Sequence, residues 1–173
     1  MEKVILVDSQ DKAIGTMEKM QAHREARLHR AFSIFLFNEN NELLIHQRAK
    51  SKYHSGGLWT NTCCSHPGPN ETLEVATKRR LKEEMGMTSD MKHMFHFTYR
   101  AKLDQGLIEH EIDHVFFGQT NQTPKVNAAE VQDWKYISLI DLEIDLQKNP
   151  DHYTAWFKII FDRVKKSIAT YIA

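Results

Sequence analysis

Cysteine is scarce in this 173-residue chain: there are two, and they are neighbours, Cys63 and Cys64. Adjacent cysteines are poorly placed to bridge each other, so a disulfide framework is excluded and a reducing, cytoplasmic setting is expected. No apolar run approaches the roughly 20 residues that a membrane-spanning helix needs. The first residues, Met1 to Val4, show no signal-peptide pattern. These absences argue against a secreted, disulfide-stapled protein and against a membrane protein.

An excess of charge of either sign is also missing, because 23 Lys and Arg residues balance 23 Asp and Glu residues. A formal net charge of +0 gives no global attraction to nucleic acid or to an acidic membrane surface. We therefore expect neither as a partner, and any bound anion must be held by a local basic cluster. Histidine, by contrast, is abundant, and the 10 histidines strengthen the expectation of a metal site.

The hydrophobic pattern indicates one α+β domain covering residues 1–173, with strands around one sheet. Apolar runs bounded by turn residues predict strands at 31–37, 43–47, 91–101, 107–117 and 131–137. A peripheral hairpin is expected at about 4–17, and helices at 71–85, 139–146 and about 154–172. Asn70 is the expected N-cap of the helix at 71–85. The basic segment 24–30, taken alone, reads as a solvated loop.

The stretch from Trp59 to Pro67 is chemically the most distinctive, because it contains both cysteines and His66. Thiols and an imidazole in a turn-prone segment suggest either a metal corner or a reactive thiol. Local sequence alone leaves both open.

The predicted strand at 107–117 carries three carboxylates on one side. A period of two residues places Glu109, Glu111 and Asp113 on the same face. Like charges so close would repel, so this face is either a polar edge in contact with water or a place where a cation neutralises them. A basic group, Arg48 with Lys52, lies ahead of a glycine-containing loop that is either a phosphate site or a solvated cluster.

The segment from Glu71 through Arg79 to Met87 resembles the Nudix box, a loop–helix–loop that binds a metal diphosphate. The resemblance implies a Nudix-like α/β/α sandwich with a mixed sheet and flanking helices. Two positions depart from the box: Ser65 stands where its first glycine belongs, and Arg80 replaces the glutamate after the arginine. The second change removes one ligand of the catalytic magnesium, which counts against a Nudix hydrolase.

The same departures, together with four short motifs, resemble type I isopentenyl-diphosphate delta-isomerases. The motifs are residues 27–33 (RLHRAFS), 61–67 (NTCCSHP), 97–101 (FTYRA) and 109–111 (EHE). The resemblance runs from about Ile5 to Trp156. It implies interconversion of isopentenyl diphosphate and dimethylallyl diphosphate in isoprenoid biosynthesis.

Site residues follow from this resemblance position by position. The implied catalytic groups are Cys64 and Glu111, with Tyr99 beside the glutamate. The implied ligands of one divalent ion (Mn, Zn or Mg) are His23, His29, His66, Glu109 and Glu111. Glu84 is implied to help hold a magnesium ion that comes with the substrate diphosphate. The implied substrate contacts are Lys19, Arg48, Lys52, Arg80 and Trp156. The interval from His23 to His29 is one residue shorter than in some family members.

The residue types suit the implied reaction. Moving the double bond requires protonation of an alkene, which gives a tertiary carbocation, and then removal of a proton from the neighbouring carbon. Cys64 on a loop and Glu111 on a strand are able to flank the substrate. The face of the Trp156 indole is able to stabilise a cation. The sequence does not determine which of Cys64 and Glu111 donates the proton.

Two competing hypotheses remain from the sequence. A Nudix hydrolase acting on a nucleoside diphosphate derivative is motivated by Glu71, Arg79, Glu83 and Glu84. A structural zinc corner without enzymatic activity is motivated by Cys63, Cys64 and His66, with one distant histidine as the fourth ligand. The expected partner is a small-molecule diphosphate substrate, and we expect a monomer or a weak homodimer.

Overall fold

The computed structural model describes residues 1–172, in which four α-helices flank a mixed nine-stranded sheet. The strands are β1 (Lys3–Val7), β2 (Ala13–Glu18), β3 (His29–Phe37), β4 (Leu43–Arg48), β5 (Trp59–Thr60), β6 (Cys63–Ser65), β7 (Met91–Lys102), β8 (Ile108–Gln119) and β9 (Val131–Ile137). The helices are α1 (Lys19–Arg24), α2 (Leu73–Met85), α3 (Leu139–Lys148) and α4 (Ala155–Ile172), with short 3-10 turns at Asp104–Gly106 and Pro150–His152.

Strand β3 is the centre of the sheet. It pairs in parallel with β8 along its whole length, from His29 opposite Glu111 to Phe37 opposite Gln119. On its other side it pairs with the short strand β6, where Ser33 lies opposite Cys64. Strands β7 and β8 form a long antiparallel hairpin, and β4 pairs with both β5 and β9. This pairing places residues of β3, β6 and β8 side by side although they are distant in the sequence.

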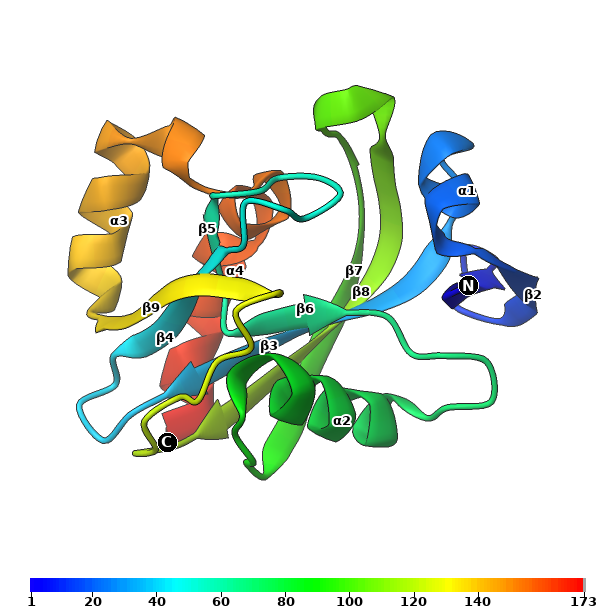
Figure 1. Ribbon diagram of the computed structural model, residues 1–173. Coiled ribbons are helices and arrows are strands. Elements are labelled where there is room, and N and C mark those ends of the chain that lie inside the picture. The colour runs from blue at the N-terminus through cyan, green and yellow to red at the C-terminus, as the bar shows by residue number, and fades with distance from the viewer. Residues whose placement is uncertain (173) are drawn as a thin grey trace.

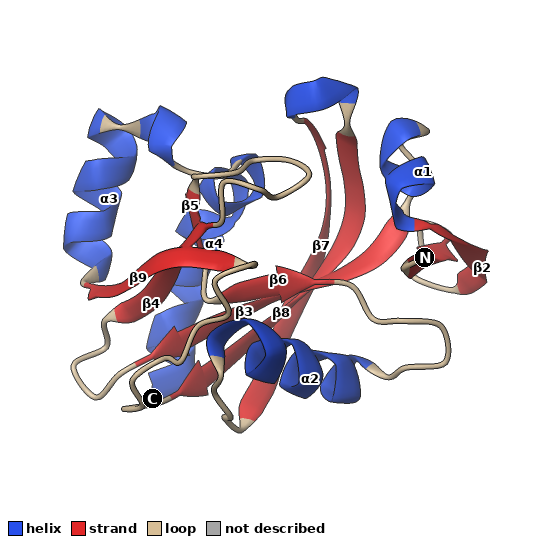
Figure 2. Cartoon of the chain, viewed as in Figure 1, coloured by secondary structure: helices blue, strands red, loops and turns tan. Residues whose placement is uncertain are grey.

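Helices cover the two faces of the sheet, α2 on one and α4 on the other (Figures 1 and 2). Alternate residues of β3 point to opposite cores because side chains alternate along a strand. Phe32, Ile34 and Leu36 pack with α2, while Phe35 and Phe37 pack with α4. The α/β/α sandwich with a mixed sheet is thus confirmed.

The expected start of α2 was wrong by two residues. Asn70 has a φ of 64° and turns the chain, and Thr72 is the N-cap, with its Oγ1 accepting a hydrogen bond from Val75 N at 3.3 Å. Glu71 is thereby free to face Arg79, which donates to it from Nε at 2.7 Å. At the other end Gly86 adopts a φ of 64°, and a Cβ there would lie 2.4 Å from Lys125 O. Only glycine fits this helix end.

The basic segment 24–30 is not a simple solvated loop. Its last two residues begin β3, and His29 is fully buried opposite Glu111. Two other pieces of sheet, β5 and β6, were not recognised from the sequence, because strands of two and three residues show no periodicity.

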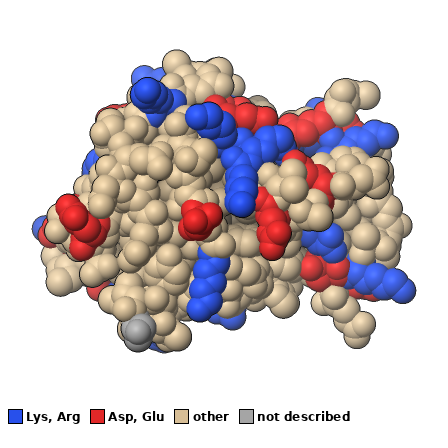
Figure 3. Space-filling model, turned by 90° about the horizontal axis from the view of Figure 1, so that it is seen from below, with Lys and Arg blue, Asp and Glu red and all other residues tan. Residues whose placement is uncertain are grey.

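Charges of both signs lie on the face of the molecule that Figure 3 shows. On the face seen in Figure 3, Lys and Arg side chains lie next to Asp and Glu side chains, as expected for a chain with a net charge of +0. Within residues 1–172, none of the helices has the length and apolar character required to cross a membrane.

Candidate active site and metal cluster

A pocket opens where β3, β6 and β8 meet the first turn of α4 and the loop before β5. Its lining combines histidines, carboxylates, a thiol and aromatic rings: Phe32, Ser33, Arg48, Tyr53, His54, Cys64, Ser65, His66, Tyr99, Glu109, Glu111 and Trp156. Seven of the predicted site residues are among them. Most of these side chains are buried, so the site is shielded from bulk water.

The carboxylate face of β8 is buried, and its members Glu109 and Glu111 line this pocket. Glu109, Glu111 and Asp113 are 4%, 5% and 2% exposed. The interpretation as a water-facing polar edge is therefore wrong. Buried carboxylates require partners, because removing a charge from water is costly.

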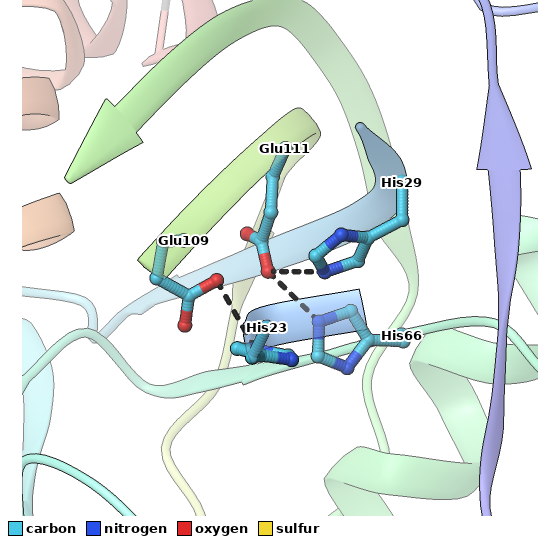
Figure 4. A group of neighbouring side chains, drawn as sticks. All are labelled: His23, His29, His66, Glu109 and Glu111. Atoms are coloured by element: carbon cyan, nitrogen blue, oxygen red, sulfur yellow. Dashed lines mark hydrogen bonds and ion pairs between the residues drawn. The ribbon is translucent and has the colours of Figure 1, made fainter. Parts of the chain in front are cut away.

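Histidines from three separate elements supply those partners (Figure 4). His66, just after β6, places Nε2 2.8 Å from Glu111 Oε1. His29, at the start of β3, places Nε2 3.2 Å from the same oxygen. His23, on α1, places Nε2 3.4 Å from Glu109 Oε2. All five predicted ligands thus converge, His23 included despite the short interval to His29, with ligand atoms within 4.8 Å of one another.

Backbone carbonyls fix which ring nitrogen faces the carboxylates. His23 Nδ1 donates to Lys19 O at 2.7 Å, and His29 Nδ1 donates to Arg27 O at 2.8 Å. The Nε2 lone pairs are thereby directed into the cluster, an arrangement typical of metal-ligating histidines. Among residues 1–172, the buried Nε2 atoms of His23 and His29 and Oε2 of Glu109 have no hydrogen-bond partner of good geometry. These orphaned atoms fit a divalent cation, and the cluster is able to hold one.

The predicted catalytic groups adjoin this cluster. Tyr99 donates its phenolic hydrogen to Glu111 Oε2 at 2.8 Å. Cys64 lies opposite Ser33 in the β3–β6 pairing and lines the same pocket, with its Sγ 3.4 Å from Asn61 Oδ1. Trp156, 4% exposed, closes the pocket from α4.

Burial keeps the proton on two of these groups. It raises the pKa of the Cys64 thiol to about 12, although Arg48 acts in the opposite direction. Burial likewise raises the pKa of Tyr99 well above its ordinary value. Burial acts upward on Glu111 too, but hydrogen bonding to Glu109, His29 and His66 outweighs it and holds the pKa of Glu111 well below the usual range. The pocket therefore combines a neutral thiol and a neutral phenol with an ionised carboxylate.

Among the predicted substrate contacts, Arg48 lies in the pocket, 7% exposed, with its guanidinium 5.3 Å from the centre of the Trp156 ring. The other basic residues do not line the pocket. They form ion pairs at its side: Lys19 with Glu2, Lys52 with Glu130, and Arg80 with Glu83, Glu84 and Glu130. Glu84 is 5% exposed, and its two oxygens are engaged by Arg80 and by the Cys63 thiol.

The structural zinc corner is not formed. Cys63 packs in the core beneath α2, whereas Cys64 packs on the α4 side of the sheet. Adjacent residues of a strand point to opposite faces, so the two thiols do not share an ion with His66. That hypothesis is wrong.

Sequence reasoning missed one histidine of the pocket. His54 is 2% exposed, and its Nε2 lies 3.2 Å from Glu109 Oε1. It follows the basic group at the end of β4, in the loop that was interpreted as either a phosphate site or a solvated cluster. An available signal was the pair Tyr53 and His54, an aromatic and an imidazole beside glycines in an otherwise polar loop.

Comparison with known proteins assigns the class of the chain. Residues 27–157 match the model of the NUDIX domain family. The structure superposes on DR0079 from Deinococcus radiodurans with a TM-score of 0.79 and 19% identity, covering 94% of this chain and 98% of that one. It also superposes on a MutT protein from Methanosarcina mazei with a TM-score of 0.66 and 20% identity, covering 80% and 94%. These structural likenesses concern the fold alone.

Relatives that match the chain in sequence define its family more narrowly than the fold does. Isopentenyl-diphosphate Delta-isomerase 2 of Aromatoleum aromaticum is 50% identical, covering 94% of this chain and 86% of that protein. Isopentenyl-diphosphate Delta-isomerase of Pectobacterium atrosepticum is 48% identical, covering 95% and 92%. The chain therefore belongs to the NUDIX family and, within it, to the isopentenyl-diphosphate delta-isomerases. The hydrolase alternative is not favoured.

Proposed function

We propose that this pocket is where the chain interconverts isopentenyl diphosphate and dimethylallyl diphosphate, with Cys64 and Glu111 as the two proton-transfer groups. The observation that carries the proposal is the placement of a half-buried thiol and a buried carboxylate on one pocket, in a chain about half identical to proteins named for this isomerisation. The chain is thus an isomerase that moves a carbon–carbon double bond.

The reaction needs one proton in and one proton out. One group protonates the terminal alkene carbon, and the double-bond electrons form the new C–H bond, which leaves a tertiary carbocation. The other group removes a proton from the adjacent carbon on the diphosphate side, and the C–H electrons form the new double bond. Cys64 and Glu111 come from β6 and β8, separate strands that both border the pocket, so the substrate is able to lie between them. In the reverse direction their roles exchange.

Tyr99 gives Glu111 a direct proton partner. Its hydroxyl donates to Glu111 Oε2 at 2.8 Å, and its raised pKa keeps it neutral. The pair is therefore able to present either a proton or a lone pair to the substrate. Cys64, as a neutral thiol, holds the second transferable proton.

Trp156 protects the cationic intermediate. A tertiary carbocation is trapped as an alcohol if water reaches it, and an indole face stabilises a cation without supplying a nucleophile. The Arg48 guanidinium lies 5.3 Å from the centre of this ring, and this contact supports the assignment of Trp156 to a positively charged group.

The diphosphate is assigned to Arg48, whose buried Nε lacks a partner among the described residues, and to the basic groups beside the pocket. We assign the remaining contacts to Lys19, Lys52 and Arg80, each of which would exchange an acidic partner for a phosphate oxygen. Glu84 would take part with a magnesium ion brought by the substrate. Arginine and lysine are the usual partners of phosphate oxygens.

His23, His29, His66, Glu109 and Glu111 would hold the resident divalent ion. Three imidazoles with two carboxylates form a donor set suited to zinc or manganese, and magnesium is the third candidate. When bound, the ion supplies positive charge that offsets the two buried carboxylates and lowers the proton affinity of Glu111. Metal analysis of the purified protein tests the assignment, which fails if His66→Asn leaves the metal content unchanged.

We assign residues 1–173 to one isomerase domain, a monomer or weak homodimer acting in the cytoplasm. The two free thiols are consistent with a reducing compartment. Sedimentation analysis tests the oligomeric state, and a stable tetramer would contradict it.

The decisive experiment is isotope incorporation. Isopentenyl diphosphate, incubated with the protein and a divalent metal in deuterated water, should give dimethylallyl diphosphate labelled on the new methyl group. A nucleoside diphosphate derivative in a parallel reaction should release no phosphate. Absence of both isomer and label, in protein shown to be folded and metal-loaded, would contradict the proposal.

A further inference from the structure

A second group of three histidines lies outside the pocket, on the β7–β8 hairpin. His93, His96 and His114 place one ring nitrogen each within 4.8 Å of the others. The His114 ring centre lies 5.2 Å from each of the other two ring centres. His93 Nε2 and His114 Nδ1 are 3.0 Å apart. Three imidazoles thus surround one point in space.

A β-bulge creates this group. Residues three apart on a regular strand point to opposite faces of the sheet. The register of β7 shifts between His93 and Phe95, so that His93 lies opposite Phe116 while His96 lies opposite His114. Phe116 and His114 share one face of β8, and the extra residue therefore brings both β7 histidines to that same face.

A carboxylate orients the buried member of the group. His114 Nε2 donates to Asp11 Oδ2 at 2.8 Å, and Arg30 Nε donates to Asp11 Oδ1 at 2.8 Å. His114 therefore presents the lone pair of Nδ1 to the other two rings. A histidine whose second nitrogen donates to a carboxylate is the arrangement that orients metal ligands and raises their basicity. The histidine cluster thus has the outer partner that a metal site requires.

We propose that His93, His96 and His114 form a second metal site, for a borderline divalent transition ion such as Zn²⁺, that fastens the Asp11 turn of the β1–β2 hairpin to the β7–β8 hairpin. A set of imidazoles without a directly coordinating carboxylate favours zinc, nickel or copper over magnesium. The site is distinct from the His/Glu cluster because His114 and Glu111 occupy opposite faces of β8. His93 and His96 are exposed, so the ion is able to enter from solvent and leave open positions for water.

Zinc stoichiometry of the full chain tests the proposal. After chelation, dialysis against Zn²⁺ should load two ions on the unmodified protein, one on His96→Asn and one on His66→Asn. His152→Asn, a matched exposed histidine in the 3-10 turn before α4, should retain two. Circular dichroism of each variant checks that it is folded. A single ion on the unmodified protein that His96→Asn retains, or two ions on His96→Asn, would overturn the proposal.

A second variant tests the orienting carboxylate. Asp11 has a φ of 61°, which asparagine tolerates, so Asp11→Asn leaves the turn intact. We expect its affinity at the second site to fall about 10- to 100-fold, with the first site unchanged. Zinc should also raise the thermal unfolding temperature less in His96→Asn than in His152→Asn. Equal zinc affinity in Asp11→Asn and in the unmodified protein would contradict the orienting role of Asp11.

Discussion

Strand β8 carries a polar cluster on each of its faces, and the two clusters differ in composition and burial. On the face toward α4, Glu109 and Glu111 meet histidines in a buried pocket. On the opposite face, His114 meets His93 and His96 in a cluster whose other members are exposed, with its carboxylate partner, Asp11, behind it. The two clusters are separate because successive side chains of a strand point to opposite faces of the sheet.

The comparison shows how the position of the carboxylate changes the chemistry. Where carboxylates stand among the imidazoles, the cluster combines ligands with groups that accept and deliver protons. Where the carboxylate stands behind an imidazole, the cluster has ligands only. We therefore expect catalysis on the first face and a structural ion on the second.

The largest difference between the faces should appear with Glu111→Gln. The amide neither accepts a proton nor ligates well, so isomerase kcat should fall by about 10³-fold or more. His96→Asn, on the other face, should retain isomerase activity. Steady-state kinetics on folded, metal-analysed proteins measure both. Similar losses in the two variants would remove the functional distinction between the faces.

The adjacent cysteines provide a matched pair across the same sheet. Cys64→Ala should remain folded and lose about 10²- to 10⁴-fold in kcat, because it removes a transferable proton from the pocket. Cys63→Ala should keep its kcat and lose about 1–2 kcal/mol of stability, since it leaves a small cavity beneath α2. Steady-state kinetics measure the loss of kcat, and denaturant unfolding measures the loss of stability, in each variant. Loss of folding in Cys64→Ala would contradict its assignment as a catalytic group.

Much of this organisation was predictable from the sequence. The strands that form most of the sheet were found from alternation, and the motif at 61–67 drew attention to Cys64 and His66, which both line the pocket. Long strands and helices repeat their pattern enough to be recognised, and the resemblance assigned residues one by one.

The remainder depends on pairing that a linear pattern does not encode. The segment that contains His29 read as a solvated loop when taken alone, because only the pairing of His29 with Glu111 across β3 and β8 buries it. The family resemblance was needed to single His29 out. His54 was missed because its partner, Glu109, is distant in sequence. The bulge that joins His93 to His96 is a register shift, visible only when both strands are aligned.

The pH dependence of stability should reveal His46, a buried histidine whose ring nitrogen faces the backbone carbonyl of Thr62. Burial, and then Arg48, lower the pKa of His46 from 6.5 to about 4. Between these two pH values, His46 is protonated in the unfolded chain and neutral in the folded chain. The contribution of His46 to the free energy of unfolding is therefore fully present above about pH 6.5. It falls as the pH drops toward 4, by at most about 3 kcal/mol. Urea unfolding of wild type and His46→Gln at pH 7 and 4.5 measures it, and the variant should show a shallower decline. Parallel declines would contradict the assignment.

The smallest effect is expected at Asp113, the third carboxylate on the face of β8 toward α4. Burial, and then the charge of Glu111, raise its pKa well above the ordinary value, and it accepts a hydrogen bond from Ser33 Oγ at 2.7 Å. We therefore expect Asp113 to be a neutral acid. Asparagine has the same shape and charge as a neutral aspartic acid. Asp113→Asn should therefore change stability by less than about 1 kcal/mol and leave metal content unchanged. Loss of metal in this variant, as in His66→Asn, would show that Asp113 is ionised and belongs to the ligand set. Retention of metal would indicate that Glu109 and Glu111, the two carboxylates that contact histidines, are the charged groups of this face.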